Sequence, residues 1–281
     1  MYCIYSGKNL DDSEMNVEHI IPLSLGGCDS FTIMVGKKIN SDLGSKIDGK
    51  FCNDFLIGLQ QLPFDNRGHS KKSKSVNLKG TVNNRPITWS LSKDGSKFYD
   101  HIDKKYLNGH MQVQVKAALD IDIRWKFVCK VALATGYYLF GENFVKYADC
   151  ETLRKAILSE NVQKEKLDLR VYTSLFPIED KDKGLHELGV MLFEYLGGSA
   201  VHFGYAPGRI IASVAINGKY VGMVNFKADV EHFPIKDDLH RCGCVLICKE
   251  NKLIQKSFWQ SVYDMNEELG IADISGLDIQ F

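Results

Sequence analysis

The chain has 281 residues, of which 44% are hydrophobic and 25% are charged. These fractions are average for folded globular domains, and they argue against a disordered, collagen-like or membrane-embedded chain. The 35 basic residues balance the 35 acidic residues, so no polyelectrolyte tail dominates the chain. The length allows one large domain or two.

The N-terminal residues and the cysteines favour a cytoplasmic protein. Met1 to Gly7 lack the basic start and long apolar run of a signal peptide, so secretion is not expected. The longest apolar stretch, Phe127 to Phe140, contains Lys130 and is shorter than the roughly 20 residues that cross a bilayer, so it predicts a buried helix and no membrane partner. Eight cysteines without a secretory start are typical of free thiols or metal ligands in a reducing cytosol.

Residues 17–56 have the pattern of a compact ββα unit. Val17 to Leu25 is β-prone, Gly26 and Gly27 supply a turn, and Phe31 to Val35 is a second β-prone run. A helix is predicted next, with Asn40 as its N-cap. Its apolar residues recur at every fourth position, at Leu43, Ile47, Phe51, Phe55 and Leu59.

The charge distribution changes near residue 60. Residues 1–60 contain five lysines and eight acidic residues, whereas the stretch from Asn66 to Lys93 contains seven basic residues and no acidic one. This stretch is rich in Ser, Asn and Gly, so it predicts a loop that leads into a short strand at Ile87 to Leu91.

The rest of the chain predicts a larger α+β domain. Residues 110–159 have a helical pattern, which is strongest from Trp125 to Val145 and returns from Glu151 to Leu158. Beyond Gly208, one β-hairpin is expected around Asn217-Gly218 and another around Lys249 to Lys252. We therefore expect an α+β chain with three parts: a ββα unit at 1–60, a basic loop and connecting strand at 61–99, and an α+β domain at 100–281.

The strongest functional signal is the run from Val17 through Glu18 and His19 to Gly27, followed by Asn40. Hydrolysis of a phosphodiester needs a base that activates water and a cation that stabilises the leaving oxygen. His19 can accept the proton of water, while the Glu18 carboxylate and the Asn40 carboxamide are oxygen donors suited to Mg²⁺. Neighbours on a strand point to opposite faces, so Glu18 and His19 share one site only where the strand is irregular or ends.

These residues resemble the His-Asn-His (HNH) endonuclease family over residues 3–57, and the resemblance extends to Gly44-Ser45-Lys46-Ile47-Asp48. It implies a ββα-metal nuclease fold around one divalent ion, Mg²⁺ or Mn²⁺. In that fold His19 would be the general base, Glu18 a metal ligand, and Asn40 the catalytic ligand at the last motif position. It also implies DNA cleavage that leaves 5′-phosphate and 3′-hydroxyl ends, in restriction or in conflict between phage and bacterium.

One departure from the family concerns zinc. The family often joins its hairpin and helix through four zinc-binding cysteines, but here Cys3 is followed by Ser6, and Gly36 and Ile39 replace the second pair. A structural zinc site needs four nitrogen or sulfur ligands. We therefore expect no structural zinc, and apolar packing in its place.

The other departure concerns the family's middle Asn, which orients the histidine. The nearest alignment places Ile33 or Met34 at this position. His19 therefore needs another partner to fix its tautomer and direction, and the sequence does not identify that partner.

Two further groups of residues have both a functional and a simpler structural explanation. Arg67, Lys71, Lys72 and Lys74 are candidate DNA contacts, because each neutralised phosphate releases counterions, and the alternative is a solvated loop. The cysteines near His240 match no common zinc-ligand spacing and are better explained as one buried face of a strand. They are Cys242, Cys244 and Cys248.

The leading hypothesis is thus a metal-dependent endonuclease acting on DNA, in which residues 100–281 select the target or sense a regulator. A homodimer, and a protein or small-molecule regulator of that domain, are compatible with it. Two rival hypotheses are a decayed nuclease that only binds nucleic acid, and a ribonuclease with the same catalytic unit. A third, an unrelated enzyme in residues 100–281, has no motif to support it.

Overall fold

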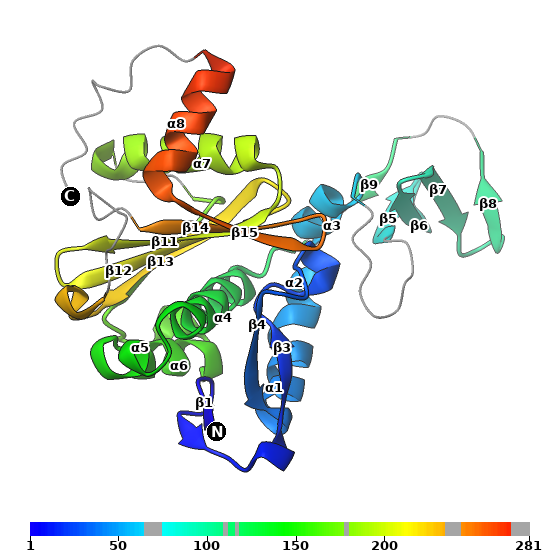
Figure 1. Ribbon diagram of the computed structural model, residues 1–281. Helices are drawn as coiled ribbons and strands as arrows, with labels where there is room; N and C mark the ends of the chain where they lie inside the picture. The colour runs from blue at the N-terminus through cyan, green and yellow to red at the C-terminus, as the bar shows by residue number, and fades with distance from the viewer. Residues whose placement is uncertain (65–74, 109–111, 116–117, 177–179, 234–242, 271–281) are drawn as a thin grey trace.

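The computed structural model describes residues 1–64, 75–108, 112–115, 118–176, 180–233 and 243–270, and it confirms the α+β class. Its centre is a six-stranded antiparallel sheet in the order β10-β13-β12-β11-β14-β15 (Figure 1). These strands are β10 (Leu169–Thr173), β11 (Ser199–Ala206), β12 (Arg209–Ile216), β13 (Lys219–Lys227), β14 (Cys244–Lys249) and β15 (Lys252–Ser257).

Helices cover both faces of this sheet (Figure 1). One face carries α4 (Ile121–Phe140), α5 (Glu142–Tyr147) and α6 (Cys150–Leu158), and the other carries α7 (Asp180–Leu196) and α8 (Phe258–Leu269). Because both faces are covered, the buried apolar side chains form two hydrophobic clusters, one on each face of the sheet. Both helical segments predicted from the apolar pattern are confirmed, and the longer one is broken at Gly141, which has a φ of 54°.

Both predicted hairpins are confirmed, and the backbone conformation of each turn explains which residue types occupy it. Asn217 and Gly218 join β12 to β13 with φ values of 48° and 75°. Glu250 and Asn251 join β14 to β15 with φ values of 52° and 57°. Two consecutive left-handed residues match the twist of the paired strands, and Asn and Gly adopt this conformation most readily.

The predicted ββα order is confirmed in the N-terminal part. A two-residue pairing of β1 (Tyr2–Cys3) with β2 (Lys8–Asn9) precedes the hairpin of β3 (Met15–His19) and β4 (Thr32–Gly36). The helix that follows is continuous through α1 (Lys37–Leu43), the π-helical turn η3 (Gly44–Asp48) and α2 (Gly49–Cys52). Short 3₁₀ turns complete the described part: η1 (Asp12–Glu14), η2 (Leu23–Leu25), η4 (Val162–Lys164) and η5 (Val230–His232).

The predicted N-cap of this helix is wrong. The helix begins at Lys37, so Asn40 lies inside the first turns of α1 rather than before them. The N-cap of α1 is Gly36, which offers no side-chain capping bond. Asp54 caps the next helix, α3 (Phe55–Gln61), where its carboxylate accepts hydrogen bonds from the backbone N–H groups of Leu56 and Ile57. The first helix ends at Cys52 and α3 begins at Phe55, so the apolar residues that recur at every fourth position lie on two helices.

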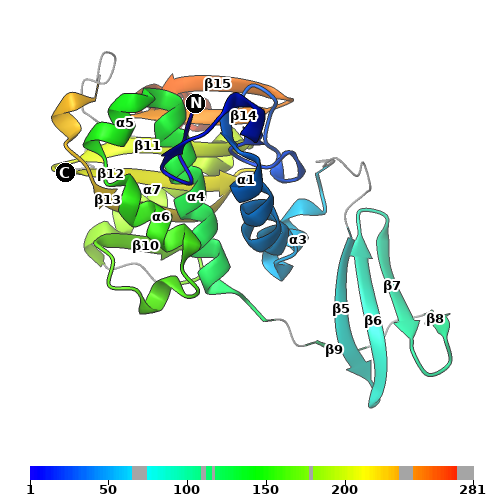
Figure 2. The ribbon, with the colours of Figure 1, turned by 90° about the horizontal axis from the view of Figure 1, so that it is seen from below.

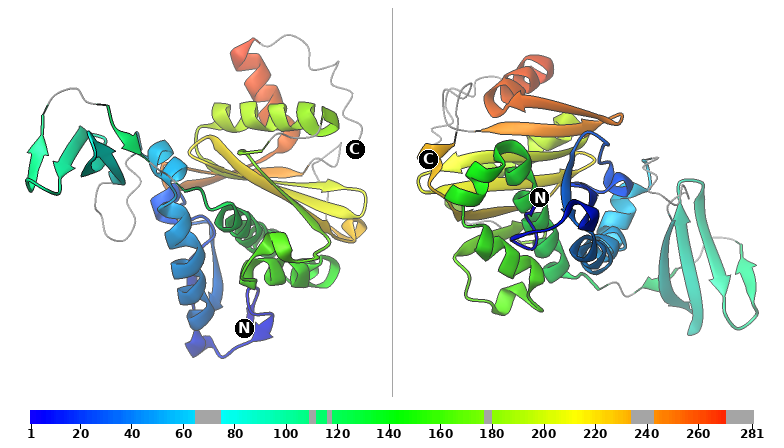
Figure 3. Two further views of the ribbon diagram at one scale, coloured as in Figure 1. Left: turned by 180° about the vertical axis from the view of Figure 1, so that it is seen from behind. Right: turned by 60° about the horizontal axis from the view of Figure 1, so that its bottom comes forward.

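The N-terminal unit packs against α4, on the same side of the central sheet (Figures 1 and 3). The rings of Phe51 and Phe127 are stacked with centroids 3.9 Å apart and an interplanar angle of 11°. Asp54 and Arg124 form a buried ion pair beside them. One hydrophobic core therefore includes side chains from both parts.

A second antiparallel sheet projects from this body (Figure 2). It has the order β8-β7-β6-β5-β9, where the sequence predicts a single strand at Ile87 to Leu91. Its strands are β5 (Ser75–Val82), β6 (Arg85–Ser92), β7 (Gly95–Asp100), β8 (Lys105–Leu107) and β9 (Gln114–Val115). Among these strands Leu78 and Ile87 are the buried apolar residues, so the amphipathic signal that reveals a strand is weak here.

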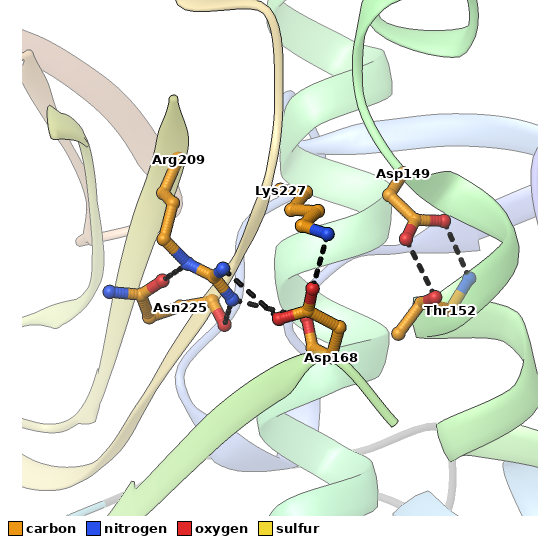
Figure 4. A network of polar contacts seen from close by, with 6 residues as sticks. All are labelled: Asp149, Thr152, Asp168, Arg209, Asn225 and Lys227. Carbon is orange, nitrogen blue, oxygen red and sulfur yellow. Dashed lines mark hydrogen bonds and ion pairs between the residues drawn. The ribbon is translucent and has the colours of Figure 1, made fainter. Parts of the chain in front are cut away.

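A network of ion pairs links the strand ends at one edge of the central sheet (Figure 4). Asp168, just before β10, accepts from Lys227 at 2.5 Å and from Arg209 at 3.1 Å. The bond from Lys227, together with Arg209, lowers the pKa of Asp168 below its usual value. These groups are exposed, so we expect them to fix the strand ends more than to add stability.

None of the helices in the described residues has the length and apolar character needed to cross a lipid bilayer.

Candidate functional site

Glu18 lies on β3, and its side chain reaches into the protein. The ammonium of Lys130 donates to Glu18 Oε1 at 2.5 Å and to Asp48 Oδ2 at 2.6 Å. Lys130 lies in the middle of α4 and is 0% exposed. We call these three residues the Lys130 cluster; they connect the β-hairpin, the following helix and α4.

The ionisation of this cluster follows from burial and from its charges. Burial alone would lower the pKa of Lys130, but Asp48, Tyr5 and Glu18 raise it above the usual value, so the ammonium stays charged. Burial raises the pKa of Asp48, and the charge of Lys130 opposes that shift. In this nearly dry environment the two carboxylates share one ammonium, so the charge balance of the cluster depends on all three residues.

His19 is the last residue of β3 and is partly exposed. Its Nε2 lies 3.1 Å from Oδ1 of Asp29, in the loop that leads to β4. The side chains of His19 and Asp29 are 21% and 66% exposed. Asp29, which contacts the ring of His19, lies four residues before Ile33, one of the two aligned positions.

Asn40 lies on α1 and faces β3. Its Nδ2 donates to Oδ1 of Asn16 at 3.2 Å. Asn16 and Glu18 are two residues apart on β3, so their side chains share one face of the strand, while His19 belongs to the alternate set. The fold thus directs Asn40 and Glu18 to the same face of β3. His19 points to the other face of the strand and contacts Asp29 in the loop beyond it.

Residues 3–56 match the model of a family described as HNH endonuclease, which confirms the predicted resemblance. No curated protein and no solved structure matches the chain. The chain therefore contains an HNH-family segment, and this segment implies nuclease activity and nucleic-acid binding in general.

HNH nucleases typically use a divalent metal ion. Within the described ranges, no group of three or more His, Cys, Asp or Glu side chains is arranged to hold a metal. The face of β3 nevertheless gathers oxygen donors from Glu18, Asp48, Asn16 and Asn40, which are hard ligands suited to Mg²⁺ or Mn²⁺. Asp48 Oδ1 is buried and has no hydrogen-bond partner among the described residues. The donors fit such an ion in kind, and Lys130 already holds one oxygen of each carboxylate.

The position at which the family often binds zinc is packed differently. Cys3 Sγ accepts a hydrogen bond from the backbone N–H of Gly36 at 3.2 Å. A Cβ on Gly36 would lie 2.6 Å from Leu10 Cδ1 and 3.6 Å from Ile39 Cγ2, so a larger residue here would displace the end of the Leu10 side chain. Apolar side chains thus surround the single thiol.

We expect the purified protein to contain much less than one equivalent of tightly bound zinc, because a structural site needs about four nitrogen or sulfur ligands. Elemental analysis after extensive dialysis is the measurement. A stoichiometric zinc atom that survives dialysis would contradict this prediction and would return the cysteines to the list of candidate ligands.

The predicted DNA contacts Arg67, Lys71, Lys72 and Lys74 lie outside the described residues. The described residues contain another basic surface. It lines a groove of about 860 Å³ between the α1–η3–α2 helix, the start of α4 and the end of α6. Its charged lining comprises Lys8, Glu14, Lys37, Lys38, Asp42, Lys46, Lys50, Lys126 and Glu160. Lys37 donates to Ser13 O and Lys126 pairs with Asp122, whereas the other four lysines bind no partner in the described part of the chain.

Sequence reasoning missed three residues that this geometry brings to the site. Lys130 is a charge in an apolar helix, and such a charge must find a partner when it is buried. Asp48 ends the Gly-Ser-x-Ile-Asp motif, which by itself assigns it no partner. Asp29 follows the double glycine, and no pattern in the sequence links it to His19.

Proposed function

We propose that the protein is an endonuclease that hydrolyses phosphodiester bonds in DNA, in the cytoplasm, with Mg²⁺ or Mn²⁺. The observation that carries this proposal is the position of His19 in the HNH segment, where its ring is accessible and paired with Asp29. A role in restriction or in conflict between phage and bacterium is the biological context that we propose with it.

The proposed mechanism assigns the proton transfer to His19. With the Nε2 proton directed to Asp29, the neutral ring carries its lone pair on Nδ1, which can take a proton from the attacking water. Glu18 and Asn40 would hold the divalent ion. The chemistry that such an ion supplies is stabilisation of negative charge on the leaving oxygen.

A second candidate function is nucleic-acid binding without cleavage. It is favoured by the Lys130 cluster, because Glu18 Oε1 lies 2.5 Å from an ammonium that a metal ion would have to share or displace. The fold of the HNH segment would then persist without its chemistry.

Cleavage of a supercoiled plasmid distinguishes these candidates. The endonuclease proposal expects nicked and linear products with Mg²⁺ or Mn²⁺, none with a chelator, and ends that carry 5′-phosphate and 3′-hydroxyl groups. A parallel assay on single-stranded RNA tests the ribonuclease alternative. Plasmid binding without nicking in either metal would favour the binding function.

The lysine groove makes a separate prediction about DNA. Reversing two of its charges, Lys46→Glu together with Lys50→Glu, is expected to weaken DNA binding and to lower the salt slope of the binding constant by about 2, because about one counterion is released per neutralised phosphate. Fluorescence anisotropy over a salt series is the measurement. Lys155→Glu, on the exposed face of α6, is the matched control. A salt slope equal to that of the wild type would exclude the groove as a phosphate-binding surface.

A further inference from the structure

The loop between the two strands of the HNH hairpin is attached to the central sheet at three points. The hydroxyl of Ser199 on β11 donates to the backbone oxygen of Leu25. The Sγ atoms of Cys28 and Cys248 lie 2.9 Å apart, which joins the loop to β14. Asn251, in the turn between β14 and β15, contacts Asp29. The conformation of this loop therefore depends on residues about 170 to 220 positions away along the chain.

The contact between Asn251 and Asp29 uses both polar atoms of the Asn251 side chain. Asn251 Nδ2 donates to Asp29 Oδ2 at 2.9 Å, and Asn251 Oδ1 accepts from the backbone N–H of Asp29 at 3.0 Å. The other carboxylate oxygen, Oδ1, faces His19 Nε2 at 3.1 Å. A continuous chain of hydrogen bonds thus runs from the β14–β15 turn to the ring of His19.

The backbone of this turn sets the direction of Asn251. Its φ of 57° is left-handed, a conformation that asparagine tolerates better than most residues, and the neighbouring Glu250 has a similar φ of 52°. The amide is therefore presented to the loop by a turn whose shape the two strands determine.

We propose that Asp29 and Asn251 are positioning residues that fix the tautomer and the direction of His19. The β14–β15 hairpin, which lies outside the HNH segment, thereby completes the catalytic site. This inference rests on the proposed function, because His19 is the base in that mechanism. The contact from Asp29 replaces the hydrogen bond that the family's middle Asn supplies. Asn251 then connects the part of the chain outside the HNH segment to the catalytic histidine.

The effect of removing these contacts distinguishes a positioning role from a purely structural one. Asp29 is 66% exposed and Asn251 is also exposed, so their hydrogen bonds exchange readily with water and add little to stability. A positioning role instead predicts a loss of kcat with little change in KM or in the melting temperature.

The test uses the full chain and two readouts, on the variants Asp29→Ala, Asp29→Glu and Asn251→Gly. Glycine at position 251 removes the amide without straining the left-handed turn, and Glu250→Gly is the matched control one residue away. The first readout is long-range ¹H–¹⁵N NMR of the histidine rings at about pH 8.5, where an ordinary imidazole is neutral. The second is kcat and KM for plasmid cleavage.

The wild type is expected to show His19 with its proton on Nε2. Asp29→Ala and Asn251→Gly should mix the tautomers and lower kcat by about 10–100-fold, as for other residues that orient a catalytic histidine. Asp29→Glu should recover part of this loss, and Glu250→Gly should behave as the wild type. Unchanged ring signals in Asp29→Ala and Asn251→Gly would overturn the inference. A wild type that cuts nothing would instead overturn the proposed function, while the ring signals would still decide whether the hairpin positions His19.

Discussion

Replacing Lys130 with methionine is expected to lower the free energy of unfolding by about 3–5 kcal/mol, the range for removing one member of a buried ion pair. Glu18 and Asp48 would lose the ammonium that lies within 2.5 and 2.6 Å of them, and both carboxyl groups would stay in the core. Methionine fills a similar volume, so the loss would reflect charge rather than a cavity. Equilibrium unfolding in urea measures the effect.

Two comparisons separate charge from general effects of the substitution. Lys155→Met, at an exposed site on the neighbouring helix α6, should change stability by less than about 0.5 kcal/mol. Combining Lys130→Met with Glu18→Gln and Asp48→Asn removes every charge of the cluster, and should recover much of the loss. A loss below about 1 kcal/mol for Lys130→Met alone would show that the ion pair does not hold the two parts together.

The same variant tests whether Glu18 can serve a metal ion. In the wild type, Lys130 competes with any divalent cation for the carboxylates of Glu18 and Asp48. Without the ammonium, Mn²⁺ should raise the melting temperature of Lys130→Met more than that of the wild type, because a ligand that binds only the folded state stabilises it. Scanning fluorimetry with Mn²⁺ or with a chelator measures the difference. Equal shifts in both proteins would argue against Glu18 as a ligand.

The local architecture could be predicted from the sequence because its causes are local. The ββα order follows from β-prone runs, a double glycine and an apolar period, and the hairpin at Asn217-Gly218 follows from the left-handed turn that these residues favour. The second sheet could be predicted only in part. Its strands bury few apolar residues, so their pattern resembles that of a polar loop.

The connections within the candidate site could not be predicted, because they join distant residues. Lys130 and Glu18 are 112 positions apart, and Asn251 and Asp29 are 222 positions apart. Asn251 has a sufficient local explanation as a turn residue, and nothing in the sequence distinguishes a turn asparagine from one that also contacts a catalytic loop. Lys130 carries the clearer signal, since a charge within the apolar helix α4 requires buried partners.

Replacing His19 with alanine is expected to lower the rate of plasmid cleavage by about 10²–10⁴-fold, the usual contribution of a general base. The substitution removes the proton acceptor and leaves Glu18, Asn40 and the Lys130 cluster in place. His19 is partly exposed at the end of β3, so the folded state and DNA binding should be largely retained. Single-turnover cleavage, with anisotropy for binding, separates the two effects.

His232→Ala is the matched control for this substitution. His232 also pairs with an aspartate, since its Nδ1 lies 3.0 Å from Asp229 Oδ2, but it lies on η5, outside the HNH segment. Its replacement should leave the cleavage rate unchanged. Added imidazole should restore part of the activity of His19→Ala, because a free base can occupy the vacated space. If His19→Ala cleaves at the wild-type rate, a group other than this imidazole activates the water, and the orienting contacts of Asp29 and Asn251 have no catalytic consequence.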